Sequence, residues 1–287
     1  IMTTYLHQDI RVRETGPASG EVLFFIHGWP DNEHVWDKQV EHYSAKGYRC
    51  VTANVPGFRK RGEPQPKYGR LSFTAVVARL SALIAEVNGG KPVTLVIHDW
   101  GSYLGFYVQN LNPELVTRVV AFDIGPPKMT PPKFRGLMGV WFMGLYYQWP
   151  LALAFLLSYL PVFGGLVGDL ICRLQSWRFK RTLKYDPSGC DFTADACWPY
   201  FHFQVDSVLE FLRLKKPLGT RKDPTPTCPV LFLYGKRGGL GGMWKWWTAS
   251  FAARTDGSSF YGLECGHWVM LEKPDEVNQH MDKFLSK

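Results

Sequence analysis

The chain has 287 residues, of which 46% are hydrophobic and 20% are charged, and this balance is that of a folded globular protein rather than a disordered one. The length suffices for one large domain or for a core with an inserted lobe. The formal net charge is +8, but lysine and arginine are scattered and their clusters "FRKRG" (58–62) and "RFKRTLK" (178–184) are short, so we expect solvated faces and no nucleic-acid partner.

The cysteines and the N-terminal stretch bear on the compartment. The six cysteines lie far apart with no C-x-x-C pair, which favours neither a zinc site nor a disulfide framework. The stretch "IMTTYLHQDIRVRETG" has no apolar segment and begins like a strand, so no secretory signal is predicted. We therefore expect a reducing, cytoplasmic compartment and no metal ion. The sequence gives no indication of the oligomeric state.

Short apolar runs recur along the chain, with helical patterns between them. The runs are continuous rather than alternating, so each predicts a strand buried on both faces, as in a parallel sheet covered by helices. The pattern "SFTAVVARLSALIAEVNGG" predicts an amphipathic helix stopped by Gly89 and Gly90, and "KPDEVNQHMDKFLSK" predicts a terminal helix with Pro274 in its first turn. The predicted strands lie in "EVLFFIHG" (21–28), "RCVTANVPG" (49–57), "PVTLVIHDWG" (92–101), "RVVAFDIG" (118–125), "PVLFLYG" (229–235) and "SSFYGLECGHW" (258–268).

This alternation breaks in the second half of the chain. Residues 126–222 lack strand patterns, and we interpret them as a helical cap inserted into a core formed by residues 1–125 and 223–287. Residues 136–168 contain no charged side chain, which predicts two helices forming an apolar lid over a pocket. A lid that also touches lipid is one alternative. A membrane span is another, although Gln148 and Pro150 interrupt the apolar run.

The stretch "LVIHDWGSYLGF" places Asp99 between a predicted strand and a predicted helix. Ligands of open parallel sheets bind at the carboxyl ends of strands, where Asp123, His267 and "HGWP" (27–30) also stand. A strand, a tight turn with a reactive side chain and a helix form a nucleophile elbow. Asp99 is therefore the candidate nucleophile, and an aspartate that only caps the helix is the alternative.

The motifs "HGWP", "HDWGS" and "CGHW", with a cap before the third, resemble those of the α/β-hydrolase fold. Within that fold the chain is similar to epoxide hydrolases and haloalkane dehalogenases, and the resemblance covers nearly the whole sequence. It implies an α/β architecture with a mostly parallel central sheet flanked by helices and an inserted helical cap. It also implies a hydrolase that needs no cofactor and acts on a small apolar substrate.

The residue types explain the chemistry that this resemblance implies. A carboxylate is already ionised near pH 7 and displaces a leaving group at an sp³ carbon, so Asp99 would form an alkyl ester with the substrate. Water must then cleave that ester, and His267 would act as the base. The backbone N–H groups of Trp29 and Trp100 would stabilise the oxyanion that forms on Asp99.

An acid that orients the histidine is missing from its common place in this family. "KRGGLGGMWKWW" follows the strand "LFLYG", and no acid occurs before Asp256. The family has a second location, after the strand that precedes the cap, where this sequence has Asp123 in "AFDIG". We therefore assign the orienting acid to Asp123, with a turn-forming aspartate before Gly125 as the alternative.

The leaving group distinguishes the two branches of the family. Epoxide hydrolases use two cap tyrosines as donors to the epoxide oxygen, and Tyr147 and Tyr200 are our candidates. Haloalkane dehalogenases hold the halide with two N–H donors, often a Trp after the nucleophile, which Trp100 matches, and an Asn at the position of Trp29. The sequence favours an epoxide hydrolase, while a dehalogenase and a catalytically retired hydrolase that binds a ligand remain alternatives.

Overall fold

The computed structural model of the protein describes residues 2–58, 69, 71–126, 146–183, 193–216, 218, 225–237 and 244–286. Parts of three predicted features lie outside the described residues. They are the first ten residues of the uncharged stretch (136–145), the basic cluster after Phe58 and most of the Gly-rich segment that follows Arg237.

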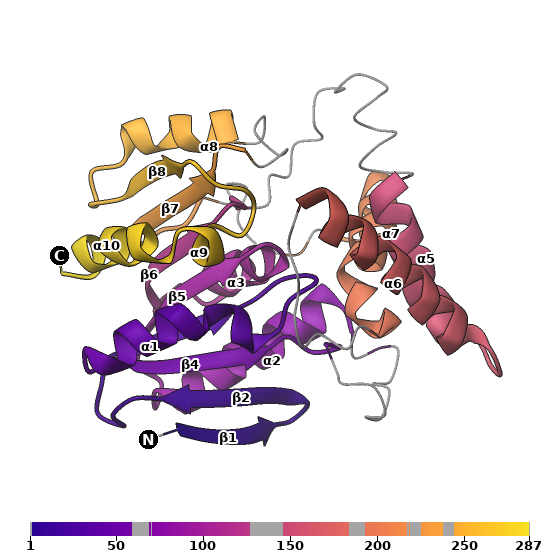
Figure 1. Ribbon diagram of the computed structural model, residues 1–287, viewed down its shortest axis with the longest axis horizontal. Coiled ribbons are helices and arrows are strands. Elements are labelled where there is room, and N and C mark those ends of the chain that lie inside the picture. The colour runs from indigo at the N-terminus through magenta and orange to yellow at the C-terminus, as the bar shows by residue number, and fades with distance from the viewer. Residues whose placement is uncertain are drawn as a thin grey trace. The chain divides into compact units, whose positions relative to one another are not determined.

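The described residues form one sheet of eight strands in the order β1-β2-β4-β3-β5-β6-β7-β8 (Figure 1). The first two strands join the sheet in antiparallel pairs, and every pair from β4 to β8 is parallel. The predicted mostly parallel sheet is thus confirmed. The strands are β1 (Met2–His7), β2 (Ile10–Thr15), β3 (Val22–Ile26), β4 (Arg49–Asn54), β5 (Val93–His98), β6 (Val116–Phe122), β7 (Val230–Gly235) and β8 (Ser259–Leu263).

The strand order fixes where a ligand site can form. Strand β3 lies between β4 and β5, so the chain moves to one side of β3 for β4 and then crosses to its other side for β5. The loops after β3 and β5 therefore leave neighbouring strand ends in opposite directions, and such a switch point opens a crevice at the carboxyl edge. Every residue of β3 and β5 is buried, as their continuous apolar runs predicted.

Two compact units divide the chain. The first, here called the sheet unit, comprises Ile1–Val55, Val77–Pro127 and Arg221–Lys287. The second, here called the helical unit, comprises Pro56–Val76 and Lys128–Thr220. The helical unit contains α5 (Trp149–Ser158), α6 (Gly164–Leu183), η5 (Ala194–Cys197) and α7 (Trp198–Phe211).

The remaining helices belong to the sheet unit, apart from the first turn of α2. The helix predicted over residues 72–90 is α2, and Gly89 and Gly90 follow its end with φ angles of 58° and 76°. The predicted terminal helix is α10, which begins at Pro274. The bounds are η1 (Glu33–Trp36), α1 (Asp37–Ala45), α2 (Phe73–Val87), α3 (Trp100–Leu111), η3 (Pro113–Leu115), α8 (Trp244–Ser250), η6 (Phe251–Ala253), α9 (Val269–Glu272) and α10 (Pro274–Leu285).

The described part of the uncharged stretch contributes to α5, which has 10 residues, and to the first turns of α6. Over the described ranges, no helix combines the length and hydropathy needed to cross a bilayer. Where the uncharged stretch is described, Leu151, Ala152, Ala154 and Phe155 are buried within the helical unit. Their burial accounts for one face of α5 only.

Candidate active site

Asp99 occupies a sharp turn between β5, which ends at His98, and α3, which begins at Trp100. Its φ and ψ angles are 52° and −125°, a conformation that costs a non-glycine residue about 1–3 kcal/mol and persists only where the surroundings impose it. The side chain makes no N-cap hydrogen bond to α3. The strained turn therefore presents the carboxylate and does not serve to cap the helix.

The turn is possible because α3 approaches β3 very closely. A Cβ atom at Gly101 would lie 2.2 Å from the backbone oxygen of Ile26, and one at Gly28 would lie 2.3 Å from Asp99 Oδ1. Only glycine fits at either position. The two glycines thus bring the loop after β3 into contact with the Asp99 side chain.

Two backbone N–H groups bind the Asp99 carboxylate. The N–H of Trp29 donates to Oδ1 at 2.8 Å, and the N–H of Trp100 also bonds the carboxylate. These are the two groups that the sequence proposed as oxyanion donors. In the resting protein they already solvate a buried negative charge.

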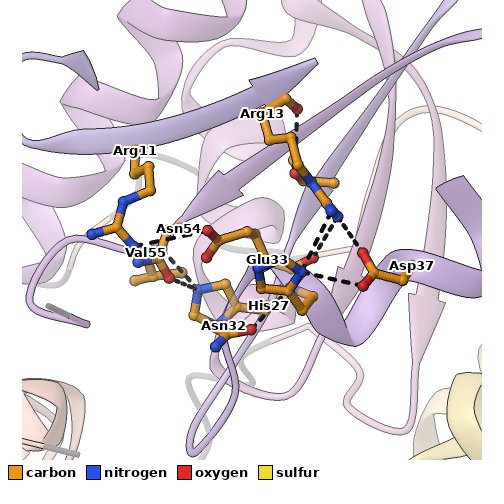
Figure 2. Close-up of polar contacts among 10 residues, drawn as sticks. Arg11, Arg13, His27, Asn32, Glu33, Asp37, Asn54 and Val55 are labelled. Atoms are coloured by element: carbon orange, nitrogen blue, oxygen red, sulfur yellow. Dashed lines mark hydrogen bonds and ion pairs between the residues drawn. The ribbon is translucent and has the colours of Figure 1, made fainter. Parts of the chain in front are cut away.

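His27 holds the loop that follows β3, and Figure 2 shows its ring beside Val55. The N–H of Val55 donates to His27 Nε2 at 2.9 Å, which leaves the Nδ1–H to donate to the oxygen of Gly28 at 2.9 Å. Burial lowers the pKa of His27, so its ring stays neutral at physiological pH. The loop is thereby tied to the end of β4, next to β3.

His267 joins Asp99 to Asp123. Its Nε2 lies 3.5 Å from Asp99 Oδ2, and its Nδ1 lies 2.5 Å from Asp123 Oδ2. Asp123 is fully buried after β6, and its Oδ1 accepts the N–H of Gly235 at 3.0 Å. Gly235 is the last residue of β7, the strand after which the sequence has no acid. The backbone N–H of that strand end therefore hydrogen-bonds the acid that follows β6, Asp123.

The two carboxylates set the charge of the imidazole. Burial alone would lower the pKa of His267, but the hydrogen bonds and charges of Asp123 and Asp99 outweigh it and raise that pKa to about 10. Burial also opposes ionisation of Asp99, yet His267 and the Trp100 N–H hold the pKa of Asp99 below its usual value. Near neutral pH the resting site therefore contains an imidazolium paired with an ionised Asp99.

A second layer of contacts positions the His267 loop. His98 packs against His267 with the ring planes tilted by 43° and the ring centroids 4.5 Å apart, and its Nε2–H donates to the backbone oxygen of His267 at 3.1 Å. Burial lowers the pKa of His98 to about 3, which keeps that ring neutral. The indole N–H of Trp268 donates to Asp31 Oδ2 at 3.1 Å. The contact between Trp268 and Asp31 had no signal in the sequence, because it joins two distant loops.

The two candidate tyrosines meet within the helical unit. Tyr200 is buried in α7 and Tyr147 precedes α5, and their hydroxyl groups form a short hydrogen bond to each other. One hydroxyl of the pair donates its proton to the other, so the two hydroxyl oxygens lie next to each other.

Within the described ranges, no three or more His, Cys, Asp or Glu side chains gather as a metal site would require. Five cysteines in those ranges are buried. Cys190 lies outside the described residues.

A strained nucleophile elbow at the switch point of a mostly parallel sheet, with histidine and acid on later strand ends, defines an α/β hydrolase. The model of the alpha/beta hydrolase family matches residues 23–280. The chain belongs to this family.

Its relatives include several epoxide hydrolases. It is 32% identical to epoxide hydrolase 2 of Caenorhabditis elegans over 114 residues, which is 40% of this chain and 31% of that protein. It is 22% identical to epoxide hydrolase 1 of the same species over 287 residues, 96% of this chain and 67% of the relative. The first match thus spans less than a third of the relative's length. Haloalkane dehalogenases also occur among the relatives.

Solved structures show the same fold. An epoxide hydrolase of Bacillus megaterium in complex with an inhibitor superposes with a TM-score of 0.69 at 19% identity, covering 99% of this chain and 100% of the other. The predicted epoxide hydrolase-like α/β hydrolase is confirmed as to family and fold by these comparisons.

The charge coupling in this site predicts a shift in the titration of His267. Asp99→Asn removes a negative charge 3.5 Å from Nε2 and should lower the His267 pKa from about 10 by roughly 1–3. Titration of the histidine ring signals by NMR measures this change. Asp256→Asn is the control, because that carboxylate pairs with Arg254 on the surface, and an unchanged pKa in Asp99→Asn would contradict the coupling.

Proposed function

We propose that the protein is an epoxide hydrolase that opens its substrate to a diol through an ester on Asp99. The observation that carries the proposal is the arrangement around Asp99, where two N–H groups and the His267–Asp123 pair converge on a strained, ionised carboxylate. A structural aspartate has no need of a histidine with its own buried acid. The kinship with epoxide hydrolases supports the same conclusion.

In the first step Asp99 attacks a carbon of the epoxide. The Trp29 N–H binds Oδ1, so Oδ2, which pairs with the His267 ring in the resting site, is the oxygen that forms the new C–O bond. The ring C–O bond breaks, its electron pair stays on the epoxide oxygen, and that oxygen takes a proton from a donor. The product is an alkyl ester on Asp99 that carries a hydroxyl group on the neighbouring carbon.

In the second step water cleaves the ester. Formation of the ester removes the charge of Asp99, and this loss lowers the pKa of His267 from about 10, since Asp99 is one of the two groups that raise it. His267 then gives up its proton, which restores the donor that protonated the epoxide oxygen, and becomes the base that takes a proton from the attacking water, while Asp123 fixes the ring through Nδ1. The N–H groups of Trp29 and Trp100 stabilise the oxyanion that forms on Asp99. The bond between the Asp99 acyl carbon and the alkyl oxygen then breaks, and the leaving oxygen takes the proton from His267 to give the diol.

We propose that the helical unit acts as the cap of this enzyme and supplies the proton of the first step. The hydrogen bond between Tyr147 and Tyr200 supports the choice of these two cap tyrosines as proton donors. Two neighbouring hydroxyl groups can both donate to one epoxide oxygen. The absence of charge over residues 136–168 favours a small apolar or lipid-like substrate.

Haloalkane dehalogenation is the second candidate, since dehalogenases are among the relatives and use the same nucleophile and base. Trp29 in place of an Asn disfavours it. A catalytically retired hydrolase is disfavoured by the His267–Asp123 hydrogen bond, because the lack of an acid after β7 was its main support.

The ester intermediate gives the direct test of the proposal. His267→Gln should accumulate a covalent alkyl-enzyme with an epoxide, because attack by Asp99 survives while ester hydrolysis does not. Asp99→Asn should form no adduct. Intact-protein mass spectrometry over a panel of epoxides and haloalkanes, followed by peptide mapping, checks both variants. An adduct on another residue would overturn the mechanism, and one formed only with haloalkanes would favour the dehalogenase.

The acid has its own test. Asp123→Asn should still form the Asp99 ester but hydrolyse it at least about a hundredfold more slowly, because loss of such an acid costs up to about 10⁴ in rate. Single-turnover kinetics separate the two steps. Asp256→Asn is the matched control and should behave like the wild type. Near-normal hydrolysis in Asp123→Asn would refute the assignment.

The tyrosines are tested by the choice of leaving group. Tyr147→Phe and Tyr200→Phe should each slow alkylation by an epoxide by about 10²–10⁴, the usual worth of a general acid, and leave ester hydrolysis unchanged. Tyr159→Phe serves as the control within the same unit. Pre-steady-state alkylation rates give the readout, and equal rates in Tyr200→Phe and wild type would remove the tyrosines from the mechanism.

A further inference from the structure

Helices α5 and α6 form a hairpin with a large exposed apolar surface. The two helices run side by side within the helical unit (Figure 1). Their outward side chains include tryptophan, leucine, valine and phenylalanine, each at least 43% exposed. We call this surface the hairpin face, and its members are Trp149, Leu153, Leu156, Leu160, Val162, Phe163, Leu166, Val167, Leu170, Leu174 and Trp177.

The hairpin face has helical periodicity. Its members recur every three or four residues from Trp149 on α5 to Leu160, which lies just after the end of α5, and on α6 they continue from Leu166 to Trp177. The opposite side of α5 is buried against α6, α7 and η5. Each helix therefore has one buried face that builds the unit and another face whose apolar side chains are exposed. Exposed apolar side chains gathered in this number on two neighbouring helices indicate an interaction site.

The exposure and the chemical type of the side chains change along the length of the hairpin. Its turn is the most exposed part, with Val162 at 84% and Phe163 at 68%. Trp149 and Trp177 lie at the other end of the face, roughly 15–20 Å away at 1.5 Å per helical residue. No charged residue occurs between Trp149 and Gly168.

The charged residues of α6 follow the same gradient. Asp169 is engaged by the backbone N–H of Ala194 within the unit. Arg173 is exposed one turn before Trp177. Its long side chain can extend the guanidinium group toward water while the apolar neighbours face lipid. Beyond Trp177 the helix carries Arg178, Lys180 and Arg181 in its last two turns.

We propose that the hairpin face docks this protein on an anionic lipid bilayer, with the turn in the acyl region and the basic end of α6 at the headgroups. The hairpin has an apolar tip, then a pair of tryptophans and then basic residues. This order matches the layers of a bilayer from hydrocarbon through the interface to the anionic headgroups. The net charge of +8 adds general attraction to such a surface. The helices insert at the surface and do not span it, in keeping with their length and hydropathy in the described ranges. This docking does not rest on the proposed reaction.

Flotation of the full chain with vesicles tests the docking. Wild-type protein should float with vesicles of phosphatidylcholine and phosphatidylserine at 7:3. Phe163→Asp and Leu166→Asp should each reduce the bound fraction about tenfold or more, because each withdraws a large apolar side chain from lipid. Leu6→Asp is the matched control, since Leu6 in β1 is 68% exposed like Phe163 and lies outside the hairpin. That variant should float like the wild type.

A second set of variants tests the role of charge. Arg178→Gln, Lys180→Gln and Arg181→Gln should each weaken binding to the anionic vesicles about fivefold and leave the weaker binding to pure phosphatidylcholine unchanged. Added salt should have the same effect as these substitutions, because it screens surface charge. Circular dichroism is the control measurement that checks whether each variant keeps its helices.

Three results would overturn the proposal. Wild-type protein that stays with the soluble fraction would do so, as would Phe163→Asp protein that floats as well as the wild type. Sedimentation equilibrium is the third measurement. If the wild type is a dimer without lipid affinity and Phe163→Asp is a monomer, a second copy of this chain covers the hairpin face.

Discussion

The site depends on burying two carboxylates beside one histidine. An unpaired charge in a protein interior costs several kcal/mol, so each carboxylate must find donors of its own. Asp99 has the N–H groups of Trp29 and Trp100, and Asp123 has that of Gly235. These three donors lie at the ends of three different strands, β3, β5 and β7, so the sheet must form before the charges can be tolerated. The same donors and charges set the titration of His267.

Much of this arrangement could be predicted because it follows from local rules. Continuous apolar runs identified the buried strands, and the switch from strand to helix identified the turn at Asp99. The carboxyl ends of parallel strands meet at one edge, so Asp99, Asp123 and the loop of Trp29 had to be near one another. Even the displaced acid could be inferred, since the segment after β7 offers no aspartate or glutamate close to the strand end.

The rest could not be predicted because it depends on contacts without a local pattern. The donation from Gly235 to Asp123 involves a backbone group, which any residue at that position would provide. The bond between Trp268 and Asp31 joins loops that are 237 positions apart in sequence. The exposure of α5 and α6 was hidden for a different reason. Apolar side chains give a helix the same composition whether they face a pocket, a partner or lipid, and only the structure separates the two faces of the helix.

In the proposed mechanism, the coupling of charge and protonation would also order the two chemical steps. While Asp99 is ionised, its charge helps to keep His267 protonated, so His267 would not act as a base before Asp99 has reacted. Ester formation would cancel the Asp99 charge and remove one of the two causes of the raised His267 pKa, while Asp123 stays hydrogen-bonded to the ring. The proposed nucleophile would thus control the proposed base through electrostatics. A serine nucleophile, which is neutral before it reacts, could not exert this control.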